Sequence, residues 1–171
     1  MINMDALEAI LTRRSIRKYT DKPVGDETVK KLLEAAMAAP SAHNRQPWHF
    51  IVIRNRATMN RITEYHNYSK MLENAALAIV VCGDNTLQET DFWIHDCSAA
   101  TENMLIAANA TGLGAVWLGV HPSKQLIDDT RELLGIPHHV TPLCIVSIGY
   151  PEEKKPPRQN YNPERVHSNK W

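Results

Sequence analysis

Apolar residues recur at helical spacing in three parts of the chain. Between residues 26 and 39 they fall at positions i, i+3, i+4 and i+7, which form one face of a helix, and Asp26 is placed to cap its start. Residues 5–14 carry a shorter pattern of the same period, and residues 124–135 carry another that Ser123 can cap. The sequence therefore predicts three amphipathic helices, each with one apolar face.

Other segments are apolar without that periodicity. Residues 91–111 are small or apolar on most sides, which predicts a long helix at the centre of a core or in a subunit interface. The polar segment between the first two strands predicts a further helix. Compact apolar runs predict strands, the first two of them buried, at residues 48–53, 77–82, 112–120 and 142–150. This alternation of helices and strands favours an α/β or α+β sheet covered by helices.

The composition indicates one domain without a strong net charge. The 171 residues contain 19 lysines and arginines against 19 aspartates and glutamates. A chain of this length can bury a core of its own, and a nucleic-acid-binding protein is more often basic. Residues 150–171 are rich in proline, lysine and asparagine and are too polar to pack alone. We therefore expect a single domain over residues 1–171, with 150–171 as an extended C-terminal arm, and no nucleic-acid partner.

The cysteines and the lengths of the apolar runs indicate the cellular compartment of the protein. Cys82, Cys97 and Cys144 lie far apart, which argues against a disulfide framework or a zinc site and for a reducing compartment. The first residues, MINMDALEAI, carry acids and no cationic leader. No apolar stretch approaches the roughly 20 residues that span a bilayer. We expect a soluble, cytoplasmic protein with no metal site and no membrane partner.

The stretch TRRSIRKY, residues 12–19, is unusually rich in cations. Arginine offers a planar fork of donors that suits phosphate, and Ser15 adds a neutral donor. A solvated helix end accounts for this run equally well. The run alone therefore leaves both interpretations open.

Two further segments carry residues suited to ligand binding. The loop APSAHNRQPWHF, residues 39–50, combines prolines with amide side chains, so it is rigid and has donors and acceptors for the edge of a heteroaromatic ring. An ordinary connection between a helix and a strand remains the alternative. In GLGAVWLG, residues 112–119, glycines suit the close approach of backbone to a flat group. Its G-x-G precedes a strand, so it is not a dinucleotide-binding fingerprint.

Taken together, these three segments resemble the FMN-dependent nitroreductase family. The string P-S-x-x-N-x-Q-P-W-H-F at residues 40–50 is the most specific part of the resemblance, and the order of elements agrees across essentially the whole chain. The resemblance implies an α+β fold, an α/β/α sandwich whose central mixed sheet is flanked by helices. It also implies an intertwined homodimer, with helix 91–111 at the centre of the interface and FMN sites between the subunits.

The resemblance also implies which residues hold FMN. Arg13 and Ser15 would hold its phosphate with Arg14 nearby, and Arg17 would reach the pyrimidine edge of the flavin and tune it. Flavin N5 does the chemistry, so no residue is assigned as catalytic. The other implied contacts are Pro40, Ser41, Ala42 and Asn44 from the partner, Asn67 and Lys70 at the polar edge of the ring, Trp117, Leu118 and Gly119 near N5, and Arg158 on the phosphate, with Lys155 as a weaker candidate.

The implied activity is that of a flavin oxidoreductase. It would move hydride from NADH or NADPH through flavin N5 to a nitroaromatic, a quinone or a similar acceptor in a ping-pong scheme. Two other interpretations stay open: an FMN storage or sensor protein without turnover, and a specialised family chemistry such as reductive dehalogenation. Residues 65–92 leave little room for a lid, so we expect an open pocket. Phe92 and Trp93 are candidate aromatic walls of that pocket, or else they pack at the start of the long helix.

Overall fold

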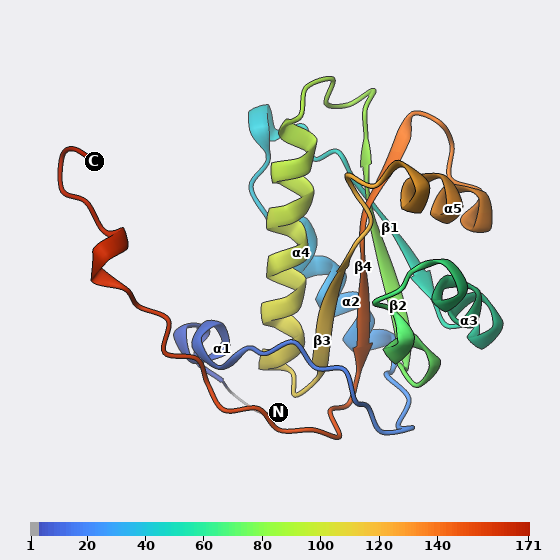
Figure 1. Cartoon of the computed structure of the whole chain (residues 1–171), viewed down its shortest axis with the longest axis horizontal. Coiled ribbons are helices and arrows are strands. Elements are labelled where there is room, and N and C mark those ends of the chain that lie inside the picture. Colours follow the sequence, from blue (N-terminus) through green and yellow to red (C-terminus); the bar gives the residue numbers. More distant parts are fainter. Residues whose placement is uncertain (1–3) are drawn as a thin grey trace.

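One sheet of four strands, in the order β1-β2-β4-β3, forms the centre of the computed structural model, which describes residues 4–171 (Figure 1). All three pairings between these strands are antiparallel. The expected mixed sheet is therefore corrected, because the parallel pairing among the described residues is an isolated bridge between Ser15 and Ala115. The strands are β1 (Trp48–Ile53), β2 (Leu77–Asp84), β3 (Gly114–Gly119) and β4 (Val140–Gly149).

Helices cover both faces of the sheet, which confirms the predicted α/β/α sandwich (Figure 1). On one face lie α2 (Asp26–Met37) and the long α4 (Phe92–Ala110), and α1 (Ala6–Thr12) packs beside α4. On the other face lie α3 (Arg56–Tyr65) and α5 (Lys124–Leu134). The helix predicted between the first two strands is thus α3, and the long apolar helix is α4.

The central strand β2 supplies both cores. Leu77, Ile79 and Val81 face α2 and α4, whereas Ala78 and Val80 face α3 and α5. Every residue of β2 is buried, as predicted. The edge strand β1 is buried only at its two ends, Trp48 and Ile53, and is exposed or partly buried between them, so the prediction that it is buried holds only in part.

The ends of the helices follow from single residues. Ser123 caps α5 as predicted, with its hydroxyl accepting a hydrogen bond from the N–H of Leu126, and Gly135 ends the helix in a left-handed conformation, with φ of 64°. The predicted cap of α2 is off by one residue. Gly25 occupies the cap, and Asp26 is the first helical residue, where its carboxylate still suits the helix dipole.

An extended segment that follows α1 crosses the ends of β3 and β4. The N–H of Ile16 donates to the carbonyl of Ala115 over 3.0 Å, and the Tyr19 hydroxyl donates to the carbonyl of Ser147 over 3.2 Å. A Cβ on Gly114 would lie 2.6 Å from the Ile16 side chain, so only glycine lets the segment come this close. This crossing places the cationic run beside the open edge of β3.

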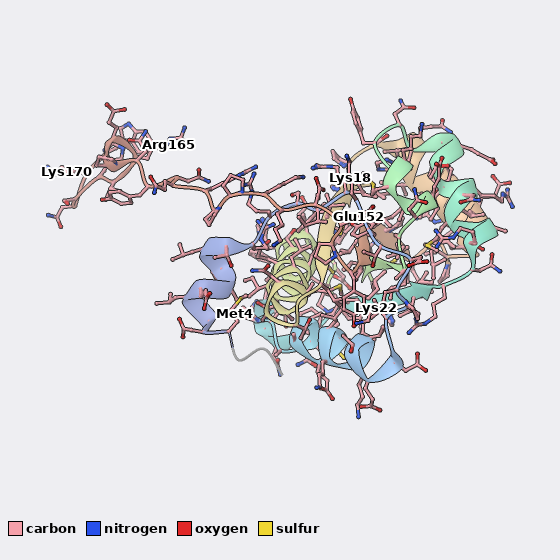
Figure 2. All side chains as sticks on the ribbon, turned by 90° about the horizontal axis from the view of Figure 1, so that it is seen from below. Met4, Lys18, Lys22, Glu152, Arg165 and Lys170 are labelled. Atoms are coloured by element: carbon pink, nitrogen blue, oxygen red, sulfur yellow. The ribbon has the colours of Figure 1, made fainter. Side chains whose placement is uncertain are left out.

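The C-terminal arm, residues 150–171, begins against the same segment. The N–H of Glu152 donates to the carbonyl of Lys18 over 2.9 Å, and these two residues lie beside each other in Figure 2. Farther along, the arm leaves the body, and Arg165 and Lys170 lie at its distant end (Figure 2). Short 3-10 turns complete the described chain at Ala42–Asn44, Lys70–Glu73 and Pro163–Arg165. Across residues 4–171, none of the helices combines the length and the apolar character that crossing a bilayer requires.

Candidate functional site

A cavity of about 860 Å³ opens at the edge of β3. This volume falls in the range of small-molecule sites. The extended segment after α1, the turn after α3, the end of β3 and the start of α5 supply its walls. Among its lining residues are six of the predicted site residues: Arg17, Asn67, Lys70, Trp117, Leu118 and Gly119.

The backbone that carries Arg17 is fixed by one carboxylate. Oε1 of Glu153 accepts hydrogen bonds from the N–H of Arg17 over 2.6 Å and from the N–H of Lys18 over 3.2 Å. The N–H of Arg17 is the main cause that lowers the pKa of Glu153. The Lys155 ammonium lies 3.2 Å from the same oxygen and donates to the carbonyl of Ser15 over 2.6 Å. Lys155 therefore fastens the arm to this segment.

The large cavity is lined by cations and by no acid. Arg17 and Lys70 both line it, and its other lining residues are neutral or histidine. Among residues 4–171, neither of these two cations forms an ion pair. Trp117 adds a flat, partly buried aromatic surface. The cavity thus suits a flat ligand that carries or accumulates negative charge.

Sequence reasoning missed several lining residues, of which His66 is the most informative. Its ring Nε2 lies 2.9 Å from the carbonyl oxygen of Gly119, and its Nδ1 accepts from the N–H of Tyr68 over 3.4 Å. No local pattern could reveal the first contact, because the two residues are 53 positions apart. The others missed are Tyr65, Tyr68, Met71, Ser123, Gln125 and Leu126, of which only Ser123 had been singled out, as a helix cap.

A second, smaller cavity of about 230 Å³ gathers the rest of the cationic run with the arm. It is lined by the predicted residues Arg13, Arg14, Ser15 and Arg158, among others. Arg13 donates through Nε to Glu102 over 3.0 Å, and Arg14 donates through Nη1 to the carbonyl of Pro156. Nε of Arg14 is buried and has no partner. A buried guanidinium donor without a partner suits a nearby anion.

The loop at residues 40–46 lines neither of these cavities. It holds the remaining predicted residues, Pro40, Ser41, Ala42 and Asn44. Three of its side-chain-bearing residues have left-handed backbones, with φ of 53° at His43, 55° at Asn44 and 49° at Gln46. Such conformations are strained in residues other than glycine and persist only where the surroundings impose them.

Two buried side chains hold this loop against the start of α4. The N–H of Ala42 donates to Oδ1 of Asp96 over 2.9 Å, and Nε2 of Gln88 donates to the carbonyl of Ala42 over 3.5 Å. Asp96 is only 5% exposed, and its second oxygen has no partner. The loop is thus fixed in a strained conformation, and its residues line neither of the two cavities of the same chain.

Comparison with known proteins identifies the chain. A model described as the nitroreductase family matches residues 10–67 and 63–150. The chain belongs to the nitroreductase family. A relative from Methanothermobacter thermautotrophicus, provisionally named an NADH dehydrogenase/NAD(P)H nitroreductase, is 48% identical over 169 residues, covering 98% of this chain and 88% of the relative. The resemblance drawn from the three sequence segments is therefore confirmed.

Solved structures of nitroreductases share the fold over almost the whole chain. One from Parabacteroides distasonis, with the same provisional name, has a TM-score of 0.94 at 43% identity and covers 97% of this chain and 98% of its own. One from Desulfovibrio desulfuricans, provisionally named a nitroreductase and solved in complex with FMN, has a TM-score of 0.84 at 32% identity, with 97% of each chain covered. The α+β architecture is thus that of this family.

The aromatic walls expected for a nitroreductase pocket are not formed by Phe92 and Trp93 within this chain. Trp93 is buried, with its ring so close to β2 that a Cβ on Gly83 would lie 2.3 Å from it, and it meets the ring of His121 edge-on. Phe92 is half exposed and meets His95 edge-on. Neither lines the large cavity. The alternative expectation, packing at the start of the long helix, holds for Trp93.

The three cysteines are free and buried. Burial raises the pKa of Cys82 and of Cys144 to about 12 and raises that of Cys97 as well. All three therefore remain protonated and unreactive at neutral pH. Among residues 4–171, no group of three or more histidine, cysteine or acidic side chains is arranged to hold a metal ion.

Proposed function

We propose that the protein is an NAD(P)H-dependent FMN oxidoreductase that delivers reducing equivalents to nitroaromatic, quinone or similar acceptors. The main support for this proposal is the arrangement of the two cavities. A cavity lined by two cations and no acid lies at the edge of β3, and the run that supplies Arg17 to it also supplies Arg14 and Ser15 to a second basic cavity. The names of the relatives, NAD(P)H nitroreductases among them, support the same activity.

The residues present fit FMN. The flat flavin ring suits the large cavity beside Trp117, and the phosphate suits the small one, where Nε of Arg14 is a buried donor without an acceptor. In this arrangement Arg13, Ser15 and Arg158 would hold the phosphate, whereas Lys155 is already engaged with Ser15 and Glu153. Asn67, Lys70, Trp117, Leu118 and Gly119 are the proposed ring contacts.

FMN supplies a carrier that accepts hydride from NAD(P)H and passes it to the acceptor. The protein orients and tunes that carrier. Arg17 would place a cation at the pyrimidine edge, where it would stabilise the negative charge that reduction brings and so favour reduction. The open cavity would leave room for donor and acceptor to bind in turn, as a ping-pong scheme requires.

The same proposal includes a homodimer in the cytoplasm. The predicted contacts at residues 40–44 lie away from both cavities of their own chain, so they contribute to a site only if a second copy brings them there. Leu7, Ile10 and Leu11 of α1 are large, apolar and exposed, which is typical of a protein–protein interface. The arm ends away from the body (Figure 1), and Tyr161 and Trp171 on it are exposed.

Anaerobic reduction tests the proposal directly. The purified protein should be yellow, and its flavin absorbance should bleach when NADH or NADPH is mixed with it in a stopped-flow instrument. A nitroaromatic or a quinone added afterwards should restore the colour. A yellow protein that neither nucleotide bleaches would contradict the enzymatic proposal and favour FMN storage or sensing, and a colourless protein that does not take up FMN would contradict the cofactor as well.

A further inference from the structure

His66 ties together two walls of the large cavity. It follows α3 directly, it is 3% exposed, and its own N–H donates to the carbonyl of Ile62. Its carbonyl accepts from both the N–H and the hydroxyl of Ser69, over 3.0 and 2.7 Å. Its ring reaches across to the carbonyl of Gly119, at the end of β3. One residue therefore fixes α3, the turn at residues 67–70 and the end of β3 relative to one another.

The partners of the ring determine its protonation. The carbonyl of Gly119 only accepts hydrogen bonds, so Nε2 of His66 must carry a hydrogen. The N–H of Tyr68 only donates, so Nδ1 must be bare. The ring is thus the neutral imidazole with its hydrogen on Nε2. A second proton would place an N–H on Nδ1 opposite the N–H of Tyr68 and would break the contact that shapes the turn.

We propose that neutral His66 is a positioning residue for FMN, and that protonation of its ring weakens FMN binding. The inference rests on the proposed function. The two walls that His66 joins are those that carry the proposed ring contacts: Asn67 and Lys70 on the turn, and Trp117 to Gly119 on β3. When the turn loosens, these contacts lose their fixed spacing. FMN must then order them on binding, and the entropy lost in doing so weakens its affinity.

The charged groups near His66 are those that line the same cavity. Arg17 and Lys70 are the cations among them. Tyr65 and Tyr68 are the other titratable groups in the lining, and α5 contributes only uncharged residues to it. A separate hollow beyond Tyr65, between α3 and α5, holds Arg61, Glu64, Asp129 and Glu132. Two cations and no acid thus line the cavity that His66 also lines.

The test compares FMN affinity across pH in the wild type and in His66→Gln. The glutamine amide can still donate to the Gly119 carbonyl, but it does not titrate. FMN fluorescence quenching by the apoprotein would be titrated at several values between pH 8 and pH 5.5, the range in which histidines change charge. The phosphate of FMN also titrates there, but this affects both proteins equally. We expect the ratio of the wild-type Kd to the His66→Gln Kd to rise by at least about fivefold toward pH 5.5.

Two controls keep the inference open to refutation. His49→Gln removes a half-exposed histidine of β1 that does not line the cavity, and its curve should follow the wild type. Circular dichroism at each pH should show the proteins folded, so that the loss is one of affinity. Parallel curves for wild type and His66→Gln, or a loss that follows unfolding, would overturn the role of His66 while leaving FMN binding intact. Failure of the wild type to bind FMN at any pH would instead refute the proposed function.

Discussion

The carboxylate of Glu153 shows how much a single residue can organise around the cavity. One of its oxygens accepts from the N–H groups of Arg17 and Lys18 and pairs with the Lys155 ammonium. These contacts fix the backbone of Arg17 at the point where its side chain lines the cavity. Glu153 is not conspicuous in the sequence, and its partner Arg17 lies 136 positions away. Only the fold brings the two together.

Replacing Glu153 by glutamine should destabilise the protein in a pH-dependent way. Because hydrogen bonds lower the pKa of Glu153 in the folded protein, its carboxylate stabilises the fold above the unfolded-state pKa of about 4.3, and this stabilisation is lost as the pH falls through the folded-state pKa. At pH 7 we expect Glu153→Gln to lose about 1 kcal/mol in urea unfolding. The difference should shrink below about pH 4.

Glu152→Gln is the matched control for that experiment. Glu152 is exposed, and only its backbone is used, in the bond to Lys18. Its replacement should change stability by less than about 0.5 kcal/mol. Equal losses in the two variants, or a Glu153→Gln deficit that persists unchanged at acidic pH, would show that the carboxylate of Glu153 does not act as described.

At the scale of elements, hydrophobic periodicity predicted several helices, but no pattern predicted whether the strands pair in parallel or antiparallel. The helices α1, α2 and α5 lie where apolar residues repeat at helical spacing, and Ser123 caps α5 as expected. The direction of the strands could not be predicted in this way. β2 and β4 are buried on both faces, and the continuous apolar run that results fits parallel and antiparallel pairing alike.

The parts of the candidate site that lie in short sequence segments could be predicted. Contacts between residues far apart in the chain could not. The cationic run and the end of β3 were recognisable, and both reach a cavity. His66 and Glu153 were not, because each contacts its partner across a long stretch of chain. Trp93 does not form an aromatic wall for a local reason, since Gly83 opens a space on β2 that the Trp93 ring fills.

The strained loop at residues 40–46 should depend on Asp96. Asp96→Ala removes the acceptor of the Ala42 N–H, whereas Asp96→Asn keeps an oxygen that can take its place. We expect hydrogen exchange in the peptide that spans the loop to become at least about tenfold faster in Asp96→Ala, which corresponds to about 1.4 kcal/mol of local stability. Exchange in Asp96→Asn should stay close to that of the wild type.

Asp91→Ala provides the comparison for a general effect on α4. Asp91 occupies the cap position of that helix, but its side chain makes no capping hydrogen bond. Its loss should therefore leave the loop protected. Exchange at the wild-type rate in Asp96→Ala, or equally fast exchange in both alanine variants, would show that the hydrogen bond between Asp96 and Ala42 does not fix the loop.

At the scale of the whole molecule, the proposed homodimer would cover the exposed apolar face of α1. We expect a dimer in sedimentation equilibrium, and we expect the double substitution Leu7→Glu with Leu11→Glu to shift it toward monomer, because charges replace the exposed apolar face of α1. Leu87→Glu, at another exposed leucine outside α1, should leave the dimer intact. A wild-type monomer, or a dimer that both charge variants preserve, would contradict the role of α1.

The fastening of the arm at Glu153 has a consequence beyond stability. Glu153 belongs to the arm and Arg17 to the cavity, so the order of one and the occupancy of the other are thermodynamically linked. Such linkage is reciprocal: a ligand that favours the bound position of Arg17 favours the seated arm by the same free energy. In the proposed homodimer, FMN binding would therefore also strengthen the contact between the arm and the partner, and a chain without FMN would assemble less tightly.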